Sequence, residues 1–145
     1  MADVAATEVV PGDAAAAALA FLTEMSPDLR GAAILDVSGS VLAASGEEEG
    51  RWAEDSAALL RAADGAGPEP AEQIHVATEQ GEVFALRHEG LTAVAVTERF
   101  ALSSLTFFDM RSVLRDLATA RRRDESGPIG DEIGPSAGAG GDDAA

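Results

Sequence analysis

Few side chains in this sequence are of the types that perform chemistry. The only histidines are His75 and His88, while Ser45 and Ser56 lie near acidic residues. A serine nucleophile needs a histidine and an acid that converge on it, and nothing in the spacing of these residues indicates such a cluster. The SGS segment at residues 38–40 is better interpreted as a turn between two strands. We therefore predict a protein without enzymatic activity.

Metal and nucleotide sites are not predicted either. The two histidines lack a recognised metal-ligand spacing, and the chain has no cysteine. Neither GxxxxGK[ST] nor GxGxxG occurs, and the GAGPEP segment has prolines where a phosphate cradle needs free N–H groups. The acidic run Glu47–Glu49 fits a solvated helix start. We expect no metal and no cofactor.

The charge balance excludes several classes of partner. The chain carries 26 acidic and 10 basic residues, a net charge of −16, and all of its basic residues are arginine. Such a surface is repelled by phosphate backbones and anionic lipids, so neither a nucleic-acid nor a membrane role is expected. No positive charge precedes Arg30, and the apolar run at residues 14–22 is too short for a span of roughly 20 residues. We expect a cytoplasmic location.

Composition also indicates the source and the domain plan. Asparagine, lysine and tyrosine, whose codons are rich in A and T, are all absent, which favours a GC-rich bacterial genome. We expect a flexible N-terminal arm at residues 1–12, one folded domain at residues 13–122 and a disordered acidic tail at residues 123–145. Because alanine supplies much of the apolar content, the core should consist of small residues with a few large anchors.

Hydrophobic periodicity predicts five strands and three helices within this domain. A hairpin of two antiparallel strands is expected at residues 31–37 and 40–45, where Asp36 can bond the turn backbone. Three further strands with tight turns, an antiparallel meander, are expected at residues 71–79, 82–89 and 91–98, the last of them central in the sheet because it is the most apolar.

The three helices frame these strands. One is expected from Asp13 to about Met25, one from the acidic run to Asp64, and one from about Ala101 to about Arg122. In the last, Phe107, Met110, Leu114 and Leu117 form the apolar stripe, which Phe108 and Val113 widen on either side.

This order resembles the roadblock/dynein light chain family. The resemblance is carried by GAAILDVSGSVLAAS, an apolar strand that ends in an acid and a glycine turn, by EDSAALLRAA, a helix rich in alanine and leucine, and by the meander EQIHVATEQGEVFALRHEGLTAVAVTE. It covers roughly residues 13–118. The arginine cluster at residues 121–123 and the acidic tail lie outside it.

The resemblance implies a five-stranded antiparallel sheet with helices on both faces, in the order α-β-β-α-β-β-β-α. It further implies pairing through the edge strand that follows the middle helix, and a role as a scaffold or as a regulator of small GTPases. The partners would be a second copy of the chain, a small GTPase or another roadblock-like protein.

Two features suggest where the chain would pair. Trp52 is either a contact between helix and sheet or an anchor in an interface, and the sequence leaves both readings open. The strand at residues 71–79 presents Ile74 and Val76 on one side, which suits the addition of a strand from a second copy. The residues predicted to mediate self-association are Trp52, Ser56, Leu59, Ile74, His75 and Val76.

The leading hypothesis is a non-enzymatic, dimeric scaffold or regulatory module that binds a protein partner. The alternative is a small-molecule-sensing domain of profilin-like or PAS-like architecture, since such domains also combine a central antiparallel sheet with flanking helices. An aromatic content of 4% argues against the alternative, because such pockets are usually lined by aromatic side chains.

Overall fold

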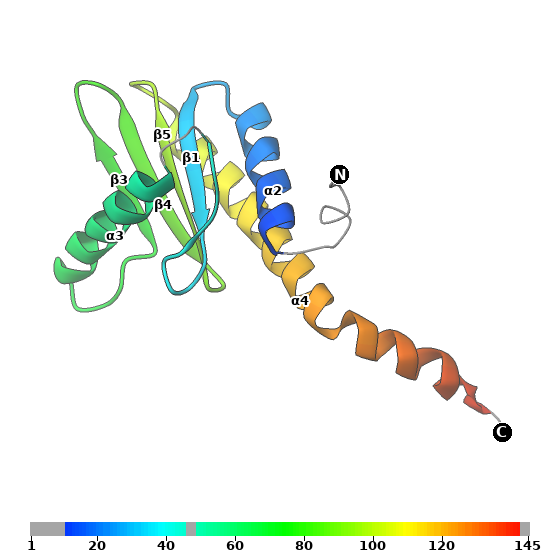
Figure 1. Ribbon diagram of the computed structural model, residues 1–145. Helices are drawn as coiled ribbons and strands as arrows, with labels where there is room; N and C mark the ends of the chain where they lie inside the picture. The colour runs from blue at the N-terminus through cyan, green and yellow to red at the C-terminus, as the bar shows by residue number, and fades with distance from the viewer. Residues whose placement is uncertain (1–10, 46–48, 143–145) are drawn as a thin grey trace.

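The computed structural model of this 145-residue chain describes residues 11–45 and 49–142 (Figure 1). Most of the expected N-terminal arm, residues 1–10, lies outside the described residues, as do Glu47 and Glu48. The elements follow the predicted order α-β-β-α-β-β-β-α. They are α2 (Pro11–Met25), β1 (Leu29–Leu35), β2 (Val41–Ala44), α3 (Glu49–Gly65), β3 (Gln73–Ala77), β4 (Glu82–His88), β5 (Leu91–Thr97) and α4 (Ser103–Asp142).

The five strands form one antiparallel sheet in the order β2-β1-β5-β4-β3. The most apolar strand, β5, lies at the centre and pairs with β1 and β4, as its sequence predicts. The strands β2 and β3 form the two edges. The predicted turn between β1 and β2 is confirmed, because Asp36 Oδ1 accepts hydrogen bonds from the backbone N–H groups of Ser38 at 2.9 Å and Ser40 at 3.0 Å.

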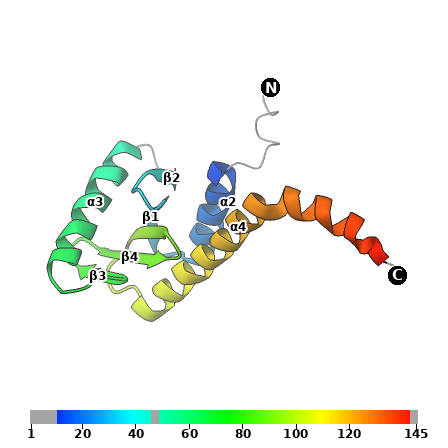
Figure 2. The same ribbon diagram turned by 90° about the horizontal axis from the view of Figure 1, so that it is seen from below.

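Helices cover both faces of the sheet, which confirms the predicted fold class. Helix α3 lies on one face, while α2 and α4 lie side by side on the other (Figures 1 and 2). The two layers of core are separate clusters. The larger joins α2 and α4 to the sheet and includes Leu19, Leu22, Ile34, Phe84, Leu86, Met110 and Leu114. The smaller lies under α3 and includes Ala33, Leu35, Ala85 and Val94.

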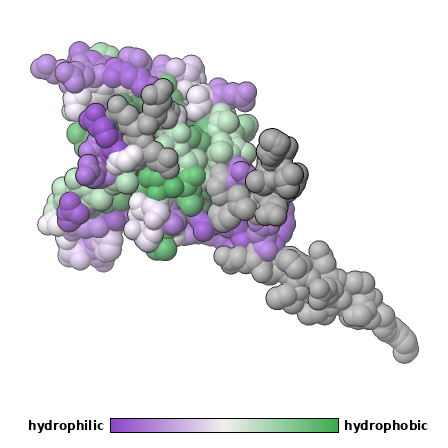
Figure 3. Space-filling view, in the orientation of Figure 1, coloured by the Kyte–Doolittle hydropathy of each residue, from purple (hydrophilic) through white to green (hydrophobic). Residues whose placement is uncertain are grey.

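Small residues make up much of this core, as the composition predicts. Buried alanines lie in α2, β1, β4, β5 and α4, and they let helices and strands approach closely. The alanine-rich outer side of α2 forms a weakly apolar surface beside the β1–β2 hairpin, whereas hydrophilic residues gather towards the rim of this face (Figure 3). Phe84 is the largest fully buried side chain, and its ring packs edge-on against Phe107 at 5.2 Å between centroids.

The ends of two helices differ from the prediction. Helix α2 begins at Pro11, two residues early, because proline is well suited to a first turn, where the acidic Asp13 also complements the helix dipole. In α4 the expected core role of Phe108 is wrong, since its side chain is 64% exposed. Two residues, roughly 200° of helix rotation, separate it from the buried Met110.

Helix α4 is longer than expected. It continues to Asp142 and extends away from the sheet (Figure 1), through a segment whose Pro128, Pro135 and several glycines disfavour helix. The division between a domain at 13–122 and a disordered tail at 123–145 therefore stays a prediction about the chain in solution. Within the described residues, no helix has an apolar stretch long enough to cross a membrane.

A tight turn joins β3 to β4 and brings Gly81 against the neighbouring backbone. Thr78 Oγ1 lies 2.7 Å from the carbonyl oxygen of Gly81, to which it donates, and it accepts from the Gln80 N–H at 3.1 Å. A Cβ atom added at Gly81 would lie 2.5 Å from the carbonyl oxygen of Thr97 and 3.1 Å from the Arg30 guanidinium. Only a residue without a side chain fits there.

We predict that Gly81→Ala lowers the free energy of unfolding by about 1–3 kcal/mol, because the clash is with backbone that cannot move aside cheaply. Urea unfolding monitored by circular dichroism measures the loss. Gly67→Ala is the matched control, since a Cβ there meets nothing within 4 Å, and its effect should stay within about 0.5 kcal/mol. Equal losses in the two variants would contradict the prediction.

Candidate self-association interface

The edge strand β3 offers an unpaired backbone to a partner. It pairs with β4 through a regular register from Gln73 to Ala77, and it stands at the end of the strand order. Its residues are exposed, apart from the half-buried Ile74, and Val76 is an exposed large apolar side chain. Edge strands of this kind, without proline and with an apolar face, pair readily with another chain.

Helix α3 lies beside this edge, on the face of the sheet to which Ile74 and Val76 point. Trp52 near its beginning packs on β1, where a Cβ at Gly31 would lie 3.2 Å from the indole ring. The indole N–H donates to the carbonyl oxygen of Ser45 at 3.2 Å. Trp52 therefore makes the contact between helix and sheet that was one of its two predicted roles. Its ring is half-buried and also lines the groove described next.

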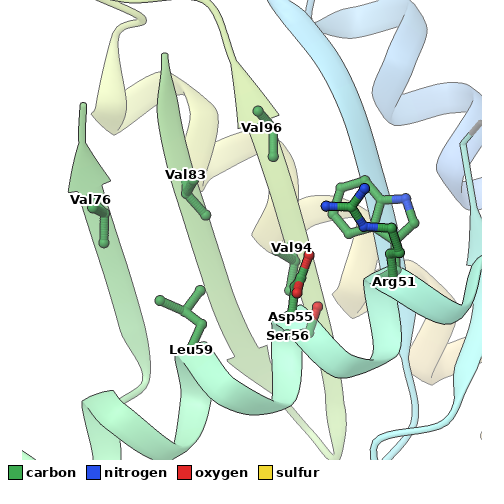
Figure 4. A pocket seen from close by; sticks show the side chains of 9 residues that line it. Arg51, Asp55, Ser56, Leu59, Val76, Val83, Val94 and Val96 are labelled. Atoms are coloured by element: carbon green, nitrogen blue, oxygen red, sulfur yellow. The ribbon is translucent and has the colours of Figure 1, made fainter. Parts of the chain in front are cut away.

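A groove of about 480 Å³ opens between α3 and strands β3, β4 and β5. Figure 4 shows Val76, Val83 and Val96 of three adjacent strands on the side of the sheet that faces α3, with Leu59 approaching from the helix. Arg51 and Asp55 of the helix also line this groove. Ser56 is 1% exposed, and its Oγ has no hydrogen-bond partner among the described residues.

The structure therefore brings together five of the six predicted interface residues. Four of them, Trp52, Ser56, Leu59 and Val76, line the groove, while Ile74 packs in the core cluster under α3. The sixth, His75, is not with them, because successive residues of a strand point to opposite faces.

His75 instead joins a small network on the other face. Its ring stacks on Phe84 at 4.4 Å between centroids, and its Nε2 lies 2.7 Å from Glu82 Oε1. The second carboxylate oxygen of Glu82 accepts the backbone N–H of Phe100 at 2.7 Å. The hydrogen bond from His75, followed by that from Phe100, holds the pKa of Glu82 below its usual range.

An ion pair fixes the other end of α3. The Arg87 guanidinium on β4 binds both carboxylate oxygens of Asp64 at 2.7 and 3.0 Å. Asp64 also accepts the N–H of Ala71, and Arg87 donates to the Ala71 carbonyl oxygen at 2.9 Å. The hydrogen bond from Arg87 is the larger cause, and that from Ala71 the next, of the lowered pKa of Asp64, about 2. This clamp sets the position of α3 relative to β3.

No catalytic or metal-binding arrangement is found in the described part of the chain. The two histidines do not meet. His75 pairs with Phe84 of β4, and His88 lies four residues further along that strand, where it pairs with Leu91. Among the described residues, no three His, Asp or Glu side chains are grouped so that they could hold a metal ion. The sequence does contain one G-x-S-x-G pattern, at residues 134–138, but it lies within α4 and not at the strand-to-helix turn that a nucleophilic serine needs.

Sequence reasoning missed Val83, Val94 and Val96 as lining residues of the groove. The alternation of β4 and β5 contains the signal, because valines with even spacing on neighbouring strands share one face. The pairing register needed to align the strands is not visible in the sequence. The role of Glu82 was missed for the same reason.

Solved structures of low sequence identity share this architecture. A roadblock/LC7 domain from Streptomyces avermitilis matches 74% of this chain and 97% of its own, with a TM-score of 0.60 at 17% identity. The chain has the roadblock/LC7 fold. Myxococcus xanthus MglB, also similar to it, matches 79% of this chain and 92% of its own (TM-score 0.65, 11% identity).

A further MglB structure, described as having a tetrameric arrangement, shares the roadblock fold over 77% of this chain and 90% of its own (TM-score 0.60, 18% identity). No protein-family model matches the sequence, and no curated protein matches it. At these identities the similarity establishes the fold, and the resemblance of the sequence to the roadblock/dynein light chain family is confirmed at that level.

We predict that Asp64→Asn destabilises the protein at neutral pH and that this effect fades in acid. The folded-state pKa of about 2 is lower than the usual 3.8, so the clamp stabilises the fold above about pH 4 and loses its contribution as the pH falls towards 2. Urea unfolding of both proteins from pH 7 to pH 2 measures the difference. Glu54→Gln, at an exposed acid on the same helix that does not line the groove, should leave stability unchanged throughout. A difference that persists at pH 2 would contradict the assignment to this carboxylate.

Proposed function

We propose that this chain is a non-enzymatic module that pairs with a second copy of itself along β3 and α3. The dimer would present its helical and strand surfaces to a protein partner, and the resemblance of the sequence favours a small GTPase as that partner. The observation that carries the proposal is the exposed edge strand β3 with an apolar groove directly beside it.

Three properties of this edge support strand addition. The backbone of β3 is paired on one side only, so a second copy can extend the sheet in the same hydrogen-bonded pattern. Val76 and the valines of β4 and β5 lie on the face that the groove exposes, and burying them removes apolar surface from water. The β3 strand contains no proline, so its backbone N–H groups are available for an added strand.

The comparisons support an assembling module of this kind. The MglB structure with a tetrameric arrangement shares the fold, so this architecture is compatible with association between copies. A regulator without a catalytic group acts by binding one state of its partner more tightly than another. That mechanism requires only a surface of defined shape.

A second candidate, the sensing of a small molecule, has one observation in its favour. The groove of about 480 Å³ has a volume typical of ligand sites, and it contains one buried hydroxyl without a partner among the residues that the structure describes. Most of the described residues that line it are valine and leucine, and Trp52 is the one aromatic side chain among them. Native mass spectrometry of the purified chain distinguishes the candidates, because a retained ligand adds mass to the monomer whereas pairing doubles it.

We predict that Val76→Asp raises the dimer dissociation constant at least about tenfold, because it places an unpaired charge in the apolar seam. Val76 is preferable to Ile74 for this test, since Ile74 packs in the core cluster under α3 and its replacement would also affect folding. Sedimentation velocity at protein concentrations from about 1 to 100 μM measures the dissociation constant, because a dimer of modest affinity dissociates within this range.

Val37→Asp is the matched control. Val37 is 86% exposed in the turn between β1 and β2, and two strands, β5 and β4, separate β1 from β3 in the sheet, so the same substitution there should leave the dimer unchanged. A wild-type chain that stays monomeric at 100 μM would refute the pairing, and so would a Val76→Asp variant that dimerises as well as the wild type.

We predict that the dimer distinguishes the nucleotide states of a small GTPase partner by at least about tenfold in affinity, equivalent to about 1.4 kcal/mol. Titration calorimetry with the GTPase from the same cell, loaded with GDP or with a non-hydrolysable GTP analogue, measures both constants. Equal affinities would leave the chain a scaffold without a regulatory role, and the absence of binding to either state would remove this class of partner.

A further inference from the structure

A cluster of large apolar side chains lies exposed where β5 leads into α4. Phe100, Leu102, Leu105 and Phe108 are 81%, 65%, 52% and 64% exposed, and all four fall between residues 100 and 108. We call these four residues the α4 patch. Single exposed apolar side chains are ordinary on a protein surface, but a cluster of this kind marks an interaction site.

The backbone holds part of this patch in an unfavourable conformation. Phe100 has a φ of +66°, a left-handed conformation that is rare and strained for a bulky residue. Glu82 accepts the Phe100 N–H at 2.7 Å and so fixes this conformation. A buried carboxylate therefore keeps an aromatic ring in water, and strain of this kind tends to be retained at functional sites.

The charges around the α4 patch are positive, although the chain as a whole is strongly acidic. The guanidinium carbon of Arg99 lies 4.6 Å from the centroid of the Phe100 ring. Arg111 and Arg115 follow Phe108 at helical steps of three and four residues, which places them along the same side of α4. Within the described residues, no ion pair joins these three arginines to an acidic side chain.

The neighbouring acids are engaged elsewhere. Glu98 binds the Arg30 guanidinium at 3.0 Å. Both oxygens of Glu82 are occupied by His75 and Phe100, although the charge of Arg99 also acts on this carboxylate at longer range. Asp109 is buried and accepts a hydrogen bond from Ser26. Asp116, on α4 itself, lies beside Phe21 on the side that faces α2. The exposed surface of the α4 patch is thus apolar, and arginines lie along its border.

We propose that the α4 patch is a docking surface for a separate protein whose binding segment combines apolar side chains with acidic ones. The apolar residues of that segment would cover Phe100, Leu105 and Phe108. Its carboxylates would meet Arg99, Arg111 and Arg115 with complementary charge. The proposal does not depend on pairing along β3, because the patch and the groove lie on different elements.

The test uses the full chain and two labelled synthetic peptides. The first is a helical peptide of about 16 residues, roughly four turns, with leucine and phenylalanine on one side and glutamate on the other. The second has lysine in place of every glutamate. Fluorescence anisotropy at low ionic strength measures both affinities, and the acidic peptide should bind at least about tenfold more tightly.

Three variants locate the site. Phe108→Glu should weaken binding of the acidic peptide at least about tenfold, and Arg115→Glu about threefold or more. Phe21→Glu is the matched control, because this ring is 51% exposed on α2 and outside the patch, and it should bind the peptide as the wild type does. Thermal unfolding by circular dichroism verifies that each variant is folded.

Four results would overturn the proposal. Equal binding of the two peptides would remove the charge argument, and unchanged binding by Phe108→Glu would remove the site. Dimers lost in Phe108→Glu but kept in Val76→Asp would assign the patch to a second copy of the chain. Tighter peptide binding after deletion of residues 124–145 would assign it to the acidic tail of the same chain. Failure of dimerisation in the wild type would leave the peptide results unaffected.

Discussion

One helix is too narrow to cover the face of this sheet on which it lies. Five strands spaced about 4.8 Å apart span roughly 19 Å, whereas a helix with its side chains is about 10 Å across. On the opposite face α2 and α4 lie side by side and together match that width (Figure 2). On the α3 face a strip of sheet stays uncovered, and the valines of β3, β4 and β5 line it.

The position of α3 decides which strip that is. Its beginning is held over β1 by Trp52, whose ring fits where Gly31 has no side chain, and its end is held at β4 by the ion pair between Asp64 and Arg87. These two anchors set the helix obliquely across the sheet (Figure 1). The uncovered strip therefore adjoins β3, so that unpaired backbone and exposed apolar surface occur at the same margin.

The order of helices and strands could be predicted from the sequence, because each helix and strand depends on a local pattern of apolar residues. The alternation of Ile74, His75 and Val76 predicts which of them share a face, and the apolar run of β5 predicts its central place. Contacts that depend on register were not accessible. His75 and Glu82 are neighbours only because β3 and β4 align as they do, and the exposure of Phe108 follows from how α4 is rotated against the sheet.

The carboxylate of Glu82 is hydrogen-bonded both to the edge strand β3 and to the segment that leads into α4. One of its oxygens binds His75 on the edge strand, and the other binds the backbone that positions Phe100. The imidazole and the Phe100 N–H thus share one anion, and each binds a different oxygen of it. A single acidic side chain thereby sets the local geometry both at the edge of β3 and at the entry to α4.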